Sequence, residues 1–150
     1  MIVGPASESG ILIRRGEENA MGLNERRKIK ELQDTVFPGR VKEIEEICGK
    51  GIPYEVDWSS IQDDYNALNF LDNISCHRLN MALRMICIDD LGKEAVREGL
   101  KTVRLKNVKD TAAKKLSFDG GVLEMHCAYA QGLSGAFSDG EIRELLTKKL

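Results

Sequence analysis

The chain has 150 residues, with 22 Lys and Arg against 24 Asp and Glu, so its formal net charge is −2. This near balance gives no reason to assign a nucleic-acid or membrane partner from net charge alone. A chain of this length is typical of one domain whose core needs no disulfide or metal for support. No apolar run reaches the length of a membrane span, and no signal-peptide pattern opens the chain, so we expect a cytoplasmic protein without a membrane segment.

The first 20 residues mix glycine, proline and serine with one short apolar stretch, which predicts a flexible N-terminal arm at 1–20 and a single domain at 21–150. From Ile29 to Cys48 apolar residues recur at spacings of three to five, which is typical of an amphipathic helix. Pro38-Gly39 interrupts this pattern and predicts a kink or a new helix start.

Alternating residues then predict a strand at Tyr54–Trp58, and the Ser59–Gln62 spacing resembles a capping box that would begin a helix at once. Helical spacing from Cys76 to Cys87 predicts a central helix. A second short helix is expected to start near Asp89-Asp90 and to end at Gly99.

Beyond Gly99 the apolar period changes from about 3.6 to 2, which predicts strands at 102–108, 115–118 and 122–127. The Asp119-Gly120 pair between the last two strands indicates a tight hairpin. Ser138 and Glu141 form a second capping box, which predicts a final helix.

These elements together predict an α+β fold with a small, mostly antiparallel four-stranded sheet. The central helix pair is expected to pack on one sheet face, with further helices at the N- and C-terminal ends. The order of the strands is left open by the sequence.

Two Cys-His pairs, Cys76-His77 and His126-Cys127, contain the ligand types of a zinc site. Neighbours on a strand point to opposite faces, so Cys127 is expected in the core and His126 outside beside Glu124. Neighbours on a helix diverge by about 100 degrees, so a four-ligand centre would be strained at both ends. The four cysteines also lack a CxxC pair, and we therefore expect buried, reduced thiols and no metal or other cofactor.

Charge is distributed unevenly along the chain. Residues 54–72 contain five carboxylates and no Lys or Arg, whereas residues 101–115 contain six basic side chains and one carboxylate, that of Asp110. These opposite patches could pair with each other inside the sheet or bind a partner. The candidate contact residues are Glu55, Asp57, Arg104, Lys106 and Lys109.

The chain contains no recognisable catalytic motif, so the leading hypothesis is a small protein-interaction module, such as a chaperone-like or inhibitory partner protein, or one that self-associates. One alternative is a hydrolase or small-molecule-binding enzyme that uses His77 or the acid pairs Asp63/Asp64 and Asp89/Asp90. Another is nucleic-acid binding through the basic 101–115 segment, although that segment has no aromatic residues for stacking on bases.

Overall fold

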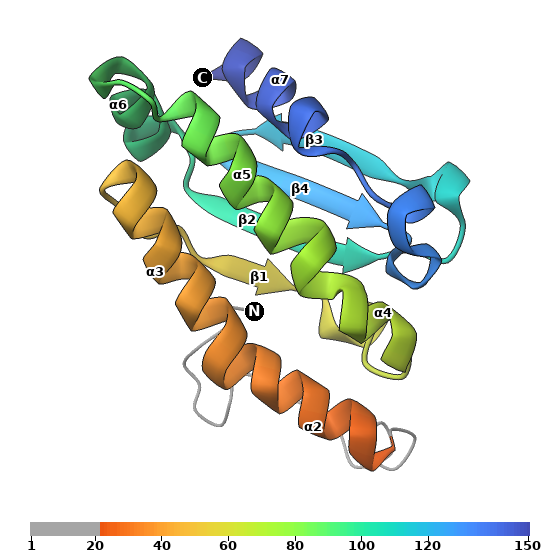
Figure 1. The fold of residues 1–150 in the computed structure, drawn as a ribbon. Helices are drawn as coiled ribbons and strands as arrows, with labels where there is room; N and C mark the ends of the chain where they lie inside the picture. The colour runs from red at the N-terminus through yellow and green to blue at the C-terminus, as the bar shows by residue number, and fades with distance from the viewer. Residues whose placement is uncertain (1–21) are drawn as a thin grey trace.

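The computed structural model describes residues 22–150, so the predicted arm at 1–20 lies outside the described residues. Figure 1 shows the arrangement of its helices and strands. The α-helices are α2 (Leu23–Glu31), α3 (Phe37–Cys48), α4 (Tyr65–Leu71), α5 (His77–Ile86), α6 (Asp90–Gly99) and α7 (Asp139–Lys149). The strands are β1 (Tyr54–Val56), β2 (Thr102–Asn107), β3 (Lys115–Asp119) and β4 (Val122–Cys127).

The fold is α+β as expected, but the sheet is mixed and mostly parallel, so the prediction of a mostly antiparallel sheet is wrong. The strand order is β1-β2-β4-β3, in which β1, β2 and β4 run parallel and only β3 is antiparallel to its neighbour. The reason lies in the connections. Helices α4 to α6 return the chain from the end of β1 to the side of the sheet where β1 begins, so that β2 runs in the same direction as β1. A crossover of this kind joins parallel strands. The hairpin then inserts β4 between β2 and β3.

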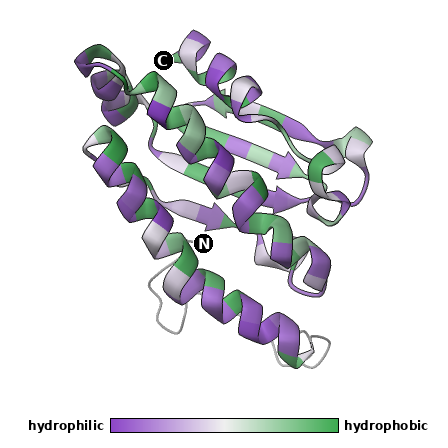
Figure 2. Cartoon of the chain, viewed as in Figure 1, coloured by the Kyte–Doolittle hydropathy of each residue, from purple (hydrophilic) through white to green (hydrophobic). Residues whose placement is uncertain are grey.

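Helices α3, α5 and α7 lie side by side across one face of the sheet, with α5 in the middle (Figure 1). The strands alternate hydrophobic and hydrophilic residues (Figure 2). In β2 and β4 every second residue is buried, and the buried hydrophobic residues of both strands belong to the core. The predicted central position of the Cys76–Cys87 helix agrees with α5, where Leu79, Ala82 and Leu83 are fully buried. Helix α6 lies at the end of the layer, beyond the ends of α3 and α5.

The β3–β4 hairpin is confirmed. Asp119 pairs with Val122, so the turn consists of Gly120 and Gly121 alone. Their φ angles are +59° and +83°, which a two-residue turn of this kind requires and which glycine adopts without steric cost. The capping box before α7 is also confirmed, since the Ser138 hydroxyl accepts from the Glu141 N–H and the Glu141 carboxylate accepts from the Ser138 N–H.

One local prediction of a helix start is confirmed and another is wrong. A single π-helical turn, Leu32–Val36, connects α2 to α3, and α3 begins at Phe37 with Pro38 in its first turn, as one of the two alternatives for Pro38-Gly39 predicted. Here its missing N–H costs little, as at any helix start. No helix begins at Ser59, because Trp58–Ser60 is a short 3-10 turn and α4 begins after Asp64, whose carboxylate caps it.

None of the helices within residues 22–150 is both long enough and apolar enough to cross a membrane.

Candidate protein-interaction surface

The sheet face opposite the helices is polar, and its side chains are half-buried or exposed within the described part of the chain. Strand register arranges them in rows across the sheet. We call this surface the open face and define it by two such rows. The first contains Glu55, Arg104, Glu124 and Ser117, and the second contains Lys106, His126 and Lys115.

Arg104 joins three strands through ion pairs in the first row. Its Nε donates to Glu55 Oε1 at 2.9 Å, and its Nη1 lies 3.7 Å from Glu124 Oε2. The adjacent position of opposite charges follows from the register, in which Arg104 is the direct partner of both Glu55 and Glu124. Glu55 of the acidic segment and Arg104 of the basic segment therefore pair inside the sheet. Pairing within the sheet was one of the two alternatives for these patches.

The second row is basic. Lys106 and Lys115 flank His126 in register, and both lysines are exposed. His126 Nε2 lies 3.4 Å from Glu124 Oε1. Partial burial lowers the pKa of His126, the Glu124 carboxylate opposes this shift, and Lys106 and Lys115 reinforce it. Lys115 Nζ lies 4.0 Å from Glu124 Oε1, whereas among residues 22–150 no carboxylate comes within ion-pair distance of Lys106, so Lys106 retains its positive charge at the surface.

The five candidate contact residues do not form one cluster. Glu55, Arg104 and Lys106 share the open face, whereas Asp57 and Lys109 lie beyond the ends of β1 and β2. The Asp57 carboxylate accepts a 2.7 Å hydrogen bond from Ser59, and the Asp57 N–H donates to the Leu105 carbonyl at 2.9 Å. Asp57 therefore stabilises the chain where it leaves β1, while Lys109 is exposed two residues beyond the end of β2.

The two Cys-His pairs are not brought together as ligands. Cys76 and Cys127 are fully buried, and burial raises the pKa of Cys127 to about 11. His126 lies on the opposite side of the sheet, beside Glu124. The described residues contain no group of three or more His, Cys, Asp or Glu side chains placed to share a metal ion.

The acid pairs considered for catalysis contain helix caps. The Asp64 carboxylate accepts from the Ala67 N–H at 3.0 Å, and Asp89 accepts from the Gly92 N–H at 2.8 Å. A shallow hollow lies between α6, the β3–β4 turn and the C-terminal end, but neither acid pair nor His77 lines it. Asp64 and Asp89 thus have a structural role as helix caps, which fits their sequence positions directly before α4 and α6.

Sequence reasoning missed a polar network between α3 and α5. The Arg40 guanidinium donates to both Asp72 oxygens, at 2.8 and 3.0 Å, and to Glu43 at 3.0 Å. Glu43 also accepts from Asn80 at 2.5 Å and pairs with Arg84 at 3.1 Å. These hydrogen bonds lower the pKa of Glu43, with that from Asn80 the largest cause. The sequence contained one signal of this network, because Asn80 is a polar residue between the apolar positions Leu79 and Leu83, and a buried polar side chain needs hydrogen-bond partners.

No protein-family model, curated protein or solved structure matches this chain.

Proposed function

We propose that this chain is a small protein-interaction module and that its binding surface is the open face of the sheet. The observation that carries the proposal is the combination of strand direction and exposure. Strands β1, β2 and β4 are parallel, yet residues 22–150 cover only one of their faces. Sheets made only of parallel strands are almost always covered on both faces, and three of the four strands here are parallel, so an open face of this kind favours a second surface that packs against it.

Charge on the open face indicates the chemistry of the partner. Arg104 is already occupied by Glu55 and Glu124, so the first row has little charge left to attract a partner. The second row offers Lys106, together with Lys115, which lies 4.0 Å from Glu124, and Lys109 is exposed two residues beyond the end of β2. An acidic protein surface complements this arrangement, and such pairing would mainly set the rate and specificity of association.

Nucleic-acid binding has less support from the same surface. Its two rows include no Phe, Tyr or Trp on which a base could stack, the imidazole of His126 is half-buried, and Arg104 is held by two carboxylates. The enzyme alternative has less support because Asp64 and Asp89 serve as helix caps. The nucleic-acid alternative remains as one outcome of the test below.

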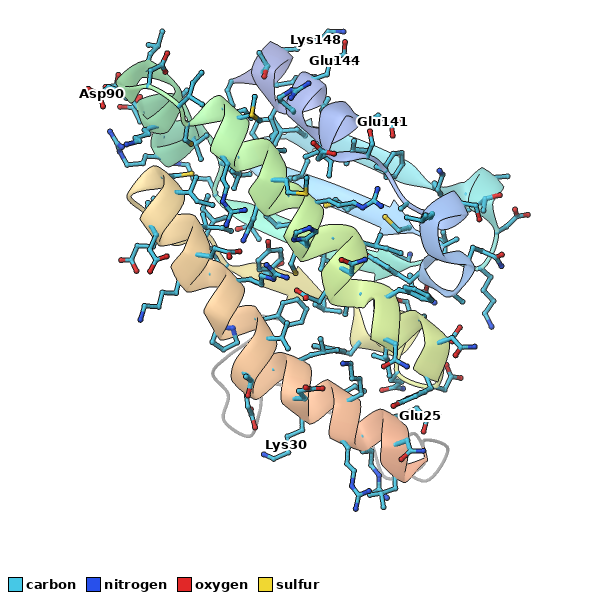
Figure 3. All side chains as sticks on the ribbon, in the orientation of Figure 1. Glu25, Lys30, Asp90, Glu141, Glu144 and Lys148 are labelled. Carbon is cyan, nitrogen blue, oxygen red and sulfur yellow. The ribbon has the colours of Figure 1, made fainter. Side chains whose placement is uncertain are left out.

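The test compares what the tagged protein and a charge-reversed variant capture from lysate of the source organism. The variant is Lys106→Glu/Lys115→Glu, which reverses the basic row without touching the core. The control is Lys148→Glu, because Lys148 projects outward from α7 on the helix side of the molecule (Figure 3). Captured proteins are quantified by mass spectrometry after elution with increasing salt.

We expect the wild type and Lys148→Glu to retain the same acidic protein, which elutes with salt because exposed charge pairs are screened. The open-face variant should retain at least about tenfold less, which corresponds to about 1.4 kcal/mol of binding free energy. Equal capture by all three proteins would contradict the proposal. Nucleic acid as the only ligand lost in the open-face variant would favour the nucleic-acid alternative.

A further inference from the structure

Two cysteines that are far apart in the sequence meet inside the protein. Cys48 is the last residue of α3, and Cys87 follows the last residue of α5. Their Sγ atoms lie 3.0 Å apart, about 1 Å more than a disulfide bond requires. Both thiols are free, and both side chains are buried.

Regular structure fixes the position of both thiols. The Cys87 N–H donates to the Leu83 carbonyl at 2.8 Å, which continues the α5 hydrogen-bond pattern through this residue. Gly49, with φ +92°, ends α3 directly after Cys48. Arg97 of α6 donates to the Cys48 carbonyl at 3.1 Å, so α6 is fixed to the C-terminal end of α3.

The remaining cysteines have different neighbours. Cys76 contacts Tyr54, and Cys127 contacts Tyr129 and Ser75. Within residues 22–150, the Cys48–Cys87 contact is the one in which two sulfur atoms approach each other at hydrogen-bond distance.

We propose that Cys48 and Cys87 are a redox modification site, and that a small peroxide such as hydrogen peroxide converts them to an intramolecular disulfide. Cys87 is the first to react, because this residue is 6% exposed whereas Cys48 is 0% exposed. The Cys87 thiolate attacks one peroxide oxygen, the O–O bond breaks, and the products are a sulfenic acid and hydroxide, which takes up the released proton as water.

The Cys48 sulfur then attacks the Cys87 sulfur. The new S–S bond forms as the S–OH bond breaks, and a second water leaves with the Cys48 proton. In total two thiols are oxidised and one peroxide is reduced to two waters. The reaction is slow at neutral pH, because burial raises the pKa of both thiols and thiolate is the reactive form. Lys93 and Arg97 oppose this shift at both thiols, while Asp89 reinforces it at Cys87.

The disulfide would tie the C-terminal ends of α3 and α5 and close a loop between residues 39 positions apart. A crosslink of this span restricts the unfolded chain much more than the folded one. The oxidised protein should therefore melt about 10 °C higher than the reduced protein.

The experiment treats the purified full chain with excess hydrogen peroxide, blocks the remaining thiols under denaturing conditions, and maps peptides without reduction. We expect a peptide pair linked through Cys48 and Cys87, which dithiothreitol releases, together with the higher melting temperature. Cys48→Ala should show neither change, whereas Cys76→Ala should still form the link.

Three results would overturn the proposal. One is linkage that involves Cys76 or Cys127 as often as the Cys48–Cys87 pair. Another is oxidation of Cys87 to sulfinic acid in the wild type without a linked peptide. The third is four unchanged thiols after prolonged peroxide treatment. All three are read from the wild-type protein, so the test holds even where a cysteine variant fails to fold.

Discussion

Arg40 connects two helical segments through one guanidinium group. It binds both oxygens of Asp72, where the π-helical turn before α5 begins, and also Glu43 one turn further along α3. Its side chain is 23% exposed, so solvent screens these contacts only in part. The Asp72 carboxylate is the main cause of the raised pKa of Arg40, which therefore stays charged.

We expect Arg40→Ala to lower the free energy of unfolding by about 2 kcal/mol, because it leaves Asp72 without its charged donor. Arg40→Lys should recover part of this loss, since an ammonium group can replace one contact but not the two-pronged geometry. Chemical denaturation measures both. Arg143→Ala is the control, because Arg143 is exposed on α7 and should change stability by less than about 0.5 kcal/mol. Equal effects at Arg40 and Arg143 would contradict this role.

His126 makes stability depend on pH. Burial lowers the pKa of His126 below its ordinary value of 6.5, so the unfolded chain binds this proton before the folded chain does as pH falls. The stability contribution is therefore complete above pH 6.5 and is lost as pH falls through the interval down to the folded-state pKa.

We expect the free energy of unfolding to fall by less than about 1 kcal/mol between pH 7.5 and about pH 5.5, and this slope to flatten in His126→Gln. Denaturation curves at several pH values measure the difference between the two proteins. The charged groups that face His126 are Glu124, Lys106 and Lys115, and they remain in both. The same slope with and without the imidazole would show that another group is responsible.

At the scale of elements, the two glycines that form the β3–β4 turn have different surroundings. A Cβ on Gly120 would meet nothing within 4 Å, whereas one on Gly121 would lie 2.5 Å from Lys101 Cγ and 3.3 Å from the Gly99 carbonyl oxygen. Gly121 also accepts backbone hydrogen bonds from Lys101 and Thr102, which join the turn to the start of β2.

Gly120→Asn should change stability by less than about 0.5 kcal/mol, because asparagine tolerates the left-handed conformation at φ +59°. Gly121→Ala should cost about 1–2 kcal/mol, since alanine is strained at φ +83° and its methyl group crowds a backbone oxygen. Thermal unfolding of the two variants measures the contrast. If both cost the same, the contacts of the turn with Lys101 and Gly99 have no energetic effect.

The elements show what the sequence could predict. Strand β4 and the hairpin followed from alternation and from Asp119-Gly120, which are local signals. The start of α4 was misplaced because both Ser59 and Asp64 can cap a helix, and only the contacts of Ser60 with Asn107 show that the chain is still held against β2 at that point. Local patterns cannot report such contacts.

At the scale of the whole molecule, strand direction was the main feature that the sequence did not reveal. Alternation showed which residues of β2 and β4 face the core, but nothing local states that these two strands are parallel neighbours. The ion pairs of the open face also depend on strand order, which the sequence did not reveal. Arg104 lies between Glu55 and Glu124 only because the sheet order places β2 between β1 and β4.

The central claim is that the open face receives an acidic surface, and an NMR titration tests it most directly. Isotope-labelled protein would be titrated with poly-glutamate and, separately, with a single-stranded oligonucleotide. The account predicts that poly-glutamate shifts the amide signals of Lys106, Lys115 and His126, and that added salt reverses the shifts. Shifts centred on Arg143 and Lys148 of α7, or shifts of the open face by the oligonucleotide alone, would contradict it.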